Sequence, residues 1–364
     1  MIYYIIYIPF ILCGCFDTED LSQKQKKIIC YFWVVVLTLF WGLRWDCGTD
    51  WQQFHDDYYL SHFKNVFSFD RGLSEQLEPG YVFINAIFNE VGVEYSVFLL
   101  FFSFLISFFF ARFCLAYSKW PIMSFVYLIL SMGIIFPNRQ ALAAAILTLG
   151  TKFIFQGNYK SFFRFLFVVI IASSIHTSAL FGIILFVIPK IILTLKKLLI
   201  VAFLVGVILF FLPSIMDYFV DITSSYLLIS GRLESYTNLV SSMGEDFSSR
   251  GIMSYALSLF FLLAYLLKKY NVSTDKVKLT FFNGYIVQES IRYVFADLMR
   301  DFMRLEFYFH PYSTSLACEL FGSSSSLKEK ILLRLVYMAL MIYFFYKMLT
   351  GIFVDLYIPY NSIL

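Results

Sequence analysis

The segment at positions 42–51 gathers the side chains with the clearest chemical potential in this chain. Arg44 precedes Asp50 by six positions, with Asp46 and a glycine between them. A carboxylate placed in this way can act as a general base or as a ligand of a divalent cation. It can equally accept backbone N–H bonds as the cap of a following amphipathic helix. The spacing favours neither interpretation of Asp50.

Two further segments place polar side chains beside apolar runs. Arg139 stands just before a run of small residues at 141–145, and a guanidinium beside free helical N–H groups makes a good anion site. The alternative is an arginine that extends its charge from a membrane interface into water. His176 lies in a polar island, where it can donate to a phosphate or accept a proton from a hydroxyl. A lone histidine near an interface is more often a structural residue.

Charged residues gather again near position 300. Arg300 and Arg304 are four positions apart, so a helix would point both to one face. Asp301 and Glu306 are available to neutralise them, which is the simpler explanation.

Glu289 and Arg292 lie deeper in the preceding apolar run. We expect them to pair with each other or with a neighbouring helix, because unpaired charges inside a membrane are costly.

Composition places these segments in a membrane protein. Of 364 residues, 60% are hydrophobic and only 15% are charged, and the mean hydropathy is +0.75. A soluble chain needs far more charge than this to cover its surface. The net charge of +3, without any run of basic and aromatic residues, gives no indication of nucleic acid binding. The six cysteines and four histidines show no disulfide or zinc spacing, so neither a metal nor a cofactor is predicted.

Apolar runs close to the length of about 20 residues that crosses a bilayer as a helix recur along the chain. They predict an all-α polytopic integral membrane protein of about 12 transmembrane helices, forming a single membrane domain over residues 1–364. The expected spans are 1–16, 28–43, 94–113, 121–137, 140–155, 162–175, 178–194, 197–213, 252–267, 279–298, 304–321 and 331–349. The apolar stretch 81–93 is short and contains asparagine and glutamate, which favours a re-entrant or interfacial segment.

The basic residues predict the orientation. Lysines fall on one side of this arrangement, in loops such as 24–27 and 268–278, and the positive-inside rule assigns that side to the cytoplasm. Both termini then face the periplasm, together with a loop at 44–80 that contains an amphipathic segment and a second loop at 214–251. Basic residues on that side are mainly arginine, whose planar fork suits phosphate and carboxylate. Simple pairing of these arginines with nearby acidic residues is the alternative.

These elements, in this order, resemble the EpsG family of exopolysaccharide and O-antigen polymerases, the Wzy-type enzymes. The matching residues extend over nearly the whole chain: Gly42-Leu43-Arg44, Gly48-Thr49-Asp50, Tyr58, Glu78-Pro79-Gly80-Tyr81, Asn138-Arg139-Gln140-Ala141-Leu142-Ala143, His176-Thr177-Ser178-Ala179-Leu180, Arg304-Leu305, Tyr308-Phe309 and Pro359-Tyr360-Asn361. The chain departs from the family pattern at Trp45 and Trp51, where smaller or tyrosyl residues are usual. A densely charged segment at 292–306 leaves the last family arginine open between Arg300 and Arg304.

The resemblance implies a membrane glycosyltransferase of GT-C-like fold in the bacterial inner membrane, acting in lipopolysaccharide or exopolysaccharide biosynthesis. It would transfer a growing glycan from undecaprenyl diphosphate to a lipid-linked repeat unit at the periplasmic face. Its partners would be the undecaprenyl-diphosphate-linked oligosaccharide, membrane lipid, a chain-length regulator and a flippase.

The chemistry that this resemblance implies suggests candidate roles for residues on physical grounds. Asp50 is the expected catalytic base, and His176 is expected to orient the substrate beside it. Arginines are expected to line one outward pocket and bind the diphosphate, since guanidinium groups can hold its developing charge without a metal. The expected substrate-binding residues are Arg44, Arg139, Arg250, Arg300, Arg304, Tyr58, Glu78 and Tyr81. Trp45 and Trp51 are further candidates for stacking on sugars.

Two other functions compete with polymerisation. A flippase or other transporter of the same anionic lipid would place its arginines deep in a central cavity, with internal repeats and broken helices. The sequence shows no convincing internal repeat. A scaffold subunit of a synthase complex would not need Asp50 and the arginines in one pocket.

Overall fold

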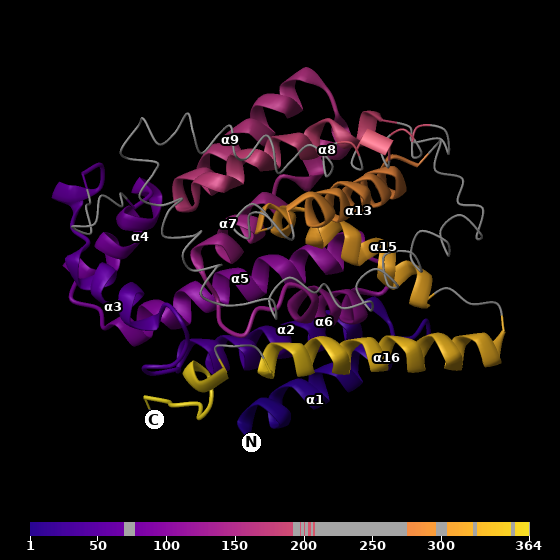
Figure 1. Cartoon of the computed structure of the whole chain (residues 1–364), viewed down its shortest axis with the longest axis horizontal. Coiled ribbons are helices and arrows are strands. Elements are labelled where there is room, and N and C mark those ends of the chain that lie inside the picture. The colour runs from indigo at the N-terminus through magenta and orange to yellow at the C-terminus, as the bar shows by residue number, and fades with distance from the viewer. Residues whose placement is uncertain are drawn as a thin grey trace.

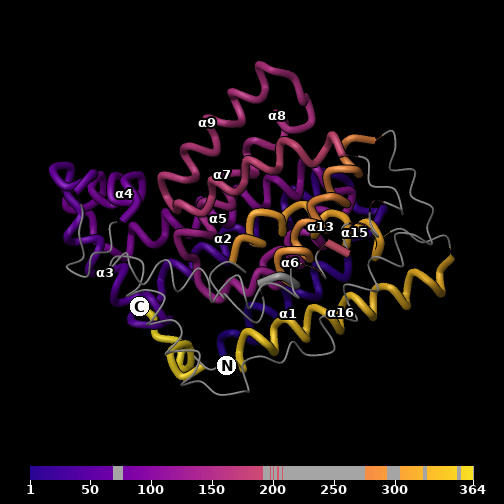
Figure 2. The backbone as a smooth tube through the Cα atoms, turned by 45° about the horizontal axis from the view of Figure 1, so that its top comes forward, coloured from indigo at the N-terminus to yellow at the C-terminus, as the bar shows by residue number. Residues whose placement is uncertain are grey.

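The computed structural model describes residues 1–68, 77–191, 275–295, 304–322, 326–350 and 354–363, together with isolated positions between 197 and 207. The described residues form helices and no strand, so the predicted helical class is confirmed. One isolated antiparallel bridge joins Arg44 to Ser362. The long helices lie roughly along one direction, as Figures 1 and 2 show.

The first three long helices build one side of the bundle: α1 (Ile2–Cys15), α2 (Gln23–Gly42) and α5 (Tyr95–Tyr117). α2 and α5 run antiparallel, because Gly42 lies against Leu100 while the Lys26 ammonium donates to the Lys119 carbonyl at the opposite end. A Cβ at position 42 would lie 2.6 Å from the Leu100 Cα atom, so only glycine permits this approach.

The middle of the chain supplies α6 (Pro121–Ser131), α7 (Arg139–Thr148), α8 (Thr151–Gln156) and α9 (Tyr159–Ile175). α7 begins at Asn138, whose side-chain oxygen accepts the Ala141 N–H at 2.8 Å. The small residues of 141–145 are all buried, so neighbouring helices approach this helix closely.

The remaining described elements are 3-10 helices and α-helices. The 3-10 elements are η2 (Thr177–Phe186), η3 (Ile188–Lys190), η5 (Arg304–Tyr308) and η6 (Val354–Leu356). The α-helices are α13 (Lys276–Phe295), α15 (His310–Gly322) and α16 (Leu327–Leu349). Arg292 on α13 binds Glu289 at 3.0 Å, which confirms the expected pair. It also binds Glu306 at 2.9 Å, the residue considered above as a partner of Arg304.

Three short elements lie together at one end of the bundle: α3 (Trp51–Leu60), η1 (Phe63–Asn65) and α4 (Pro79–Glu90). Figure 1 shows α3 and α4 at its left, near the carboxyl terminus. α4 covers most of the apolar stretch 81–93. The C-terminal segment returns to this end, where the Trp45 N–H donates to the Asn361 carbonyl at 2.9 Å and the Ile363 N–H to the Leu43 carbonyl at 3.0 Å. We call this the arginine end, since Arg44 and Arg139 lie here, and the opposite end the lysine end, since it carries Lys26 and Lys119.

At the lysine end, the start of α2 differs from the predicted span. α2 starts at Gln23, earlier than the expected span 28–43, because Ser22 and Gln25 form a capping box. Lys26, expected in a loop, is therefore on a helix and buried, where its ammonium lies 3.0 Å from the Asp17 carboxylate.

Three described helices are long and apolar enough to cross a membrane on their own: α2, α5 and α16. Their exposed faces carry large apolar side chains, such as Phe101 on α5 and Leu335 on α16, as lipid-facing helices do. Shorter apolar elements occupy Ile2–Cys15, Pro121–Ser131 and Thr177–Lys190. The expected spans 197–213 and 252–267, and the loop 214–251, lie outside the continuously described residues. These features support a membrane protein.

Candidate functional site

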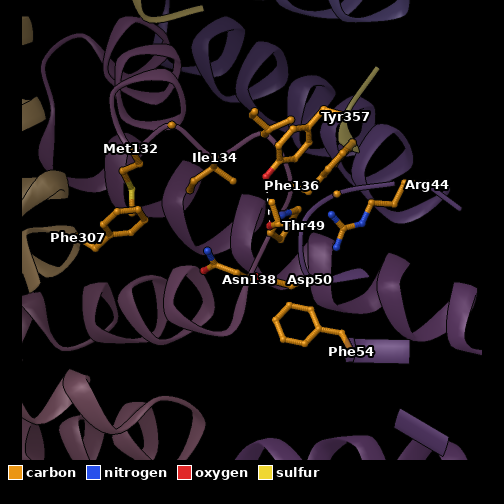
Figure 3. Close-up of a pocket in the computed structure, with 14 residues that line it drawn as sticks. Arg44, Thr49, Asp50, Phe54, Met132, Ile134, Phe136, Asn138, Phe307 and Tyr357 are labelled. Atoms are coloured by element: carbon orange, nitrogen blue, oxygen red, sulfur yellow. Dashed lines mark hydrogen bonds between the residues drawn. The ribbon is translucent and has the colours of Figure 1, made fainter. Parts of the chain in front are cut away.

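A pocket opens at the arginine end between the loop that follows α2, the α6–α7 connection and the C-terminal segment (Figure 3). We call it the Arg44 pocket. Its volume is about 90 Å³, several times what one water molecule needs. The lining residues are Arg44, Gly48, Thr49, Asp50, Phe54, Met132, Gly133, Ile134, Ile135, Phe136, Pro137, Asn138, Phe307 and Tyr357. Sequence positions from four separate parts of the chain, 44–54, 132–138, 307 and 357, therefore meet in one cavity.

Arg44 is the dominant charge in this pocket. Its side chain is only 4% exposed, and its guanidinium carbon lies 4.5 Å from the centre of the Phe136 ring. The buried Nε–H has no hydrogen-bond partner, and Arg44 forms no ion pair with any described residue. Burial lowers the pKa of the guanidinium from its ordinary value. A buried cation without a counter-charge is costly, so the site is suited to an anionic ligand.

The local chain path explains how Arg44 becomes enclosed. Gly48 has a φ of +112°, and a Cβ atom there would lie 3.2 Å from a guanidinium nitrogen of Arg44. The Gly48 N–H donates to the Leu356 carbonyl at 2.7 Å, which ties this turn to the C-terminal segment. A glycine turn and a returning chain end thus fold around the arginine.

Asp50 lies at the mouth of the same pocket, so the structure brings Asp50 and Arg44 together. The residue is exposed and precedes the first residue of α3, but its side chain makes no capping hydrogen bond. It also forms no ion pair with the described residues, and its charge acts on Arg44. The capping interpretation therefore lacks its hydrogen bond, and the carboxylate is available for other chemistry.

Arg139 lies next to the pocket but has a partner of its own. Its Nη1 contacts Glu78 Oε2 at 2.5 Å, and the other Glu78 oxygen accepts the Thr177 N–H at 3.0 Å. The guanidinium carbon is 5.3 Å from the Tyr81 ring centre and 5.8 Å from that of Phe54, a residue that lines the Arg44 pocket. Arg139 is therefore paired with an acidic residue, the alternative that the sequence left open for the arginines. Arg44 has no such partner among the described residues.

His176 belongs to a hydrogen-bonded chain on the other side of Arg139. Its Nδ1 lies 2.8 Å from the Ser178 hydroxyl, which lies 2.6 Å from the Tyr308 hydroxyl. The side-chain amide of Gln140 donates to the Arg304 carbonyl at 2.7 Å. These hydrogen bonds join the start of η2 to Tyr308, the last residue of η5, and the start of α7 to Arg304, the first residue of η5. His176 itself does not line the Arg44 pocket.

The other predicted site residues do not line the Arg44 pocket or lie outside the described residues. Tyr58 is fully buried and its hydroxyl donates to the Val93 carbonyl at 2.5 Å, so it lies away from the pocket. Arg304 is exposed at the start of η5. Arg250 and Arg300 lie outside the described residues.

Two tyrosines beside Arg44 were not singled out from the sequence. Tyr357 lines the pocket, and its hydroxyl lies 3.4 Å from the Thr49 hydroxyl. Tyr95 is electrostatically coupled to Arg44, and its buried hydroxyl has no hydrogen-bond partner. The family resemblance at Pro359-Tyr360-Asn361 lies in the same returning segment, but nothing in the sequence predicted that this segment reaches the pocket.

No group of three or more histidine, cysteine, aspartate or glutamate residues within the described parts of the chain is arranged to hold a metal ion. The residues that line the Arg44 pocket supply a buried guanidinium, an exposed carboxylate and the hydroxyl groups of Thr49 and Tyr357.

Comparison with known proteins identifies a family. The family model of the EpsG family matches residues 27–362, nearly the full chain. No curated protein and no solved structure matches the chain. The family match covers both the Arg44 pocket and the Arg139–Glu78 pair.

Proposed function

We propose that this chain, which belongs to the EpsG family of Wzy-type polymerase-like proteins, extends a lipid-linked glycan at the membrane surface. The donor is a growing glycan on undecaprenyl diphosphate, and the acceptor is a lipid-linked repeat unit. The arginine end faces the periplasm, and the helical bundle is a GT-C-like membrane domain of about 12 spans in the inner membrane.

One observation carries the proposal. A buried arginine that forms no ion pair with a described residue shares a pocket with an exposed carboxylate whose side chain makes no hydrogen bond to a described residue. Glycosyl transfer from a diphosphate needs these two groups: a cation for the leaving group and a base for the attacking hydroxyl. Both groups lie at an end of the helical bundle, and the ends of membrane-spanning helices are where lipid head groups sit.

The reaction follows from these two groups. Asp50 accepts the proton of an acceptor sugar hydroxyl as its oxygen attacks the anomeric carbon of the donor glycan. The bond from that carbon to the diphosphate oxygen breaks, and undecaprenyl diphosphate leaves with the electron pair. Arg44 binds the negative charge that develops on the leaving oxygen, and its fixed position avoids the cost of reorganisation. Arg139, held by Glu78, helps to shape the same region.

The competing functions fit the site less well. A transporter needs its charges within a central cavity, whereas the Arg44 pocket lies at an end of the bundle. A scaffold subunit has no need for a buried unpaired arginine beside a free carboxylate.

Replacement of Asp50 by asparagine tests the proposal. Asparagine keeps the size of the side chain but removes the base, and loss of a positioned base typically costs about 10²–10⁴-fold in rate. In a deletion strain that carries Asp50→Asn, we expect lipid acceptors with single repeat units, at a normal amount of the protein in the membrane. Gel electrophoresis of the surface polysaccharide measures the chain length.

Asp20→Asn is the matched control, because Asp20 is an exposed acidic residue of the α1–α2 connection at the lysine end. It should leave long chains. Long chains at wild-type level from the Asp50→Asn strain would refute the catalytic role of Asp50. A requirement of the purified protein for a divalent cation would instead make Asp50 or Asp46 a metal ligand.

A further inference from the structure

Four aromatic rings form a compact cluster beside the pocket mouth, which we call the α3 platform: Trp45, Trp51, His55 and Tyr59. The His55 ring stacks on Trp51 with centres 5.0 Å apart and planes at 22°. Trp45 meets Trp51 edge-to-face at 4.9 Å, and Tyr59 meets His55 in the same manner at 4.9 Å. Trp51 is buried beneath the others, so it fixes the positions of the outer rings.

The outer rings of the platform are accessible. Trp45 is 37% exposed and Tyr59 is 45% exposed. Trp45 is five positions before Asp50, and Trp51 directly follows it. The platform therefore adjoins the pocket at which the proposed reaction takes place.

Polar groups border these rings on the exposed face of α3. The Gln52 amide donates to Asp56 Oδ1 at 3.0 Å, and His55 Nδ1 lies 3.3 Å from the same oxygen. Gln52, Gln53 and Asp56 are exposed. An amide and a carboxylate held in fixed positions can exchange hydrogen bonds with ligand hydroxyl groups.

A pyranose ring matches this combination of surfaces. One face of the ring presents C–H groups, which pack on the electron-rich face of an aromatic ring. Its edge carries hydroxyl groups, which suit the carboxylate and amide. α3 exposes Leu60 beside Tyr59, but Gln52, Gln53 and Asp56 make most of its exposed face polar, which suits a hydroxyl-rich ligand better than the apolar chains of lipid.

We infer that the α3 platform binds a pyranose ring of the repeat unit next to the sugar that reacts at Asp50. This inference rests on the proposed function, since it assigns the platform to the same glycan substrate. The platform thereby selects which repeat unit is polymerised.

Direct binding of sugar tests the inference. The probe is the water-soluble repeat-unit oligosaccharide, released from its lipid and titrated calorimetrically into the purified full chain in lipid nanodiscs. Trp45→Ala should weaken binding by about 10-fold, the loss expected when an aromatic contact face is removed. Trp45→Phe should restore most of the affinity, because it restores a ring. In a polymerisation assay, Trp45→Ala should raise KM for the acceptor and leave kcat close to wild type.

Phe67→Ala is the control, since Phe67 is 89% exposed but lies outside the platform. It should bind the oligosaccharide like the wild type. Tyr59→Ala provides a second variant for the case in which Trp45→Ala does not fold. Unchanged affinity in both platform variants, or no binding by the wild type, would overturn the inference. A loss of thermal stability in nanodiscs without any change in sugar affinity would also overturn it, because that result assigns the rings to packing within the protein.

The two proposals fail in different ways. Long chains from Asp50→Asn together with weak sugar binding by Trp45→Ala would reject the catalytic scheme and retain the platform. Single repeat units from Asp50→Asn together with normal binding by Trp45→Ala would reject the platform alone.

Discussion

Two arginines at the same end of the molecule have different environments, and the difference decides what each can do. Arg139 contacts Glu78 at 2.5 Å, whereas Arg44 has no ion pair with a described residue. The sequence marks both as candidates for phosphate binding. It does not show that Glu78, 61 positions before Arg139, forms an ion pair with Arg139. The choice between pairing and ligand binding therefore depends on long-range contacts.

Replacement of Arg44 by lysine tests the anion site. Lysine keeps the charge but loses the planar fork and the stacking on Phe136. Loss of one positioned charge-stabilising donor typically costs about 10²–10³-fold in rate. We expect Arg44→Lys to shorten the surface polysaccharide sharply, and gel electrophoresis of the deletion strain that carries the variant measures this.

Arg112→Lys is the comparison for Arg44→Lys, because Arg112 is an exposed arginine on α5 towards the lysine end. It should leave the chain length unchanged. Normal chain length from Arg44→Lys, at equal protein level, would mean that positive charge alone is sufficient at position 44.

At the scale of elements, apolar runs predicted the positions of the described helices well. The expected span 94–113 is α5, and 331–349 lies within α16. The predicted first and last residues of the helices were less accurate, because they depend on capping residues such as Ser22 and on turns. The 3-10 geometry of 177–186 was not predicted, and neither was the role of Asp17 at the start of α6.

Asp17 connects three elements at the lysine end. Its Oδ2 accepts the N–H groups of Ile122 at 2.9 Å and Met123 at 3.2 Å, in the first turn of α6. Its Oδ1 lies 3.0 Å from the Lys26 ammonium, and both side chains are buried. A buried carboxylate thus caps one helix and neutralises a second.

Asp17→Asn should therefore destabilise the protein. The amide still caps α6, but Lys26 is left buried without its counter-charge, and breaking a buried pair in this way typically costs about 3–5 kcal/mol. We expect a clear fall in Tm of the detergent-purified protein, followed by fluorescence. Addition of Lys26→Met should recover much of the loss, because it removes the unpaired charge.

Glu19→Gln serves as the reference for Asp17→Asn. Glu19 contacts Lys119 at 2.7 Å, but both side chains are largely exposed, and such pairs contribute little to stability. Equal falls in Tm for the two variants would contradict the importance of burial at Asp17.

At the scale of the whole molecule, Lys26 and Lys119 lie at one end of the described helices, and Arg44 and Arg139 lie at the other. The amino terminus lies at the arginine end, where the Tyr3 hydroxyl donates to the Tyr357 carbonyl at 2.5 Å. The C-terminal segment lies there too, bridged to Arg44. The sequence anticipated this separation through the lysine distribution, but not the direct contact between the chain ends, since no local pattern encodes a pairing over more than 300 positions.

Reporter fusions test the orientation that follows from this separation. Lysines at the Lys26–Lys119 end assign that end to the cytoplasm, so the arginine end and both termini should lie outside. A phosphatase that is active only in the periplasm should be inactive when fused at Ser22 or Ser118 and active when fused at Gly133 or at the carboxyl terminus. Ser118 and Gly133 form the sharpest pair, because only α6 separates them. α6 spans 11 residues and is shorter than the about 20 that usually cross a bilayer, so equal signals at these two positions would show that it does not cross. In that case α6 would not separate the Arg44 pocket from the cytoplasm. The prediction that the pocket faces the periplasm would then be wrong.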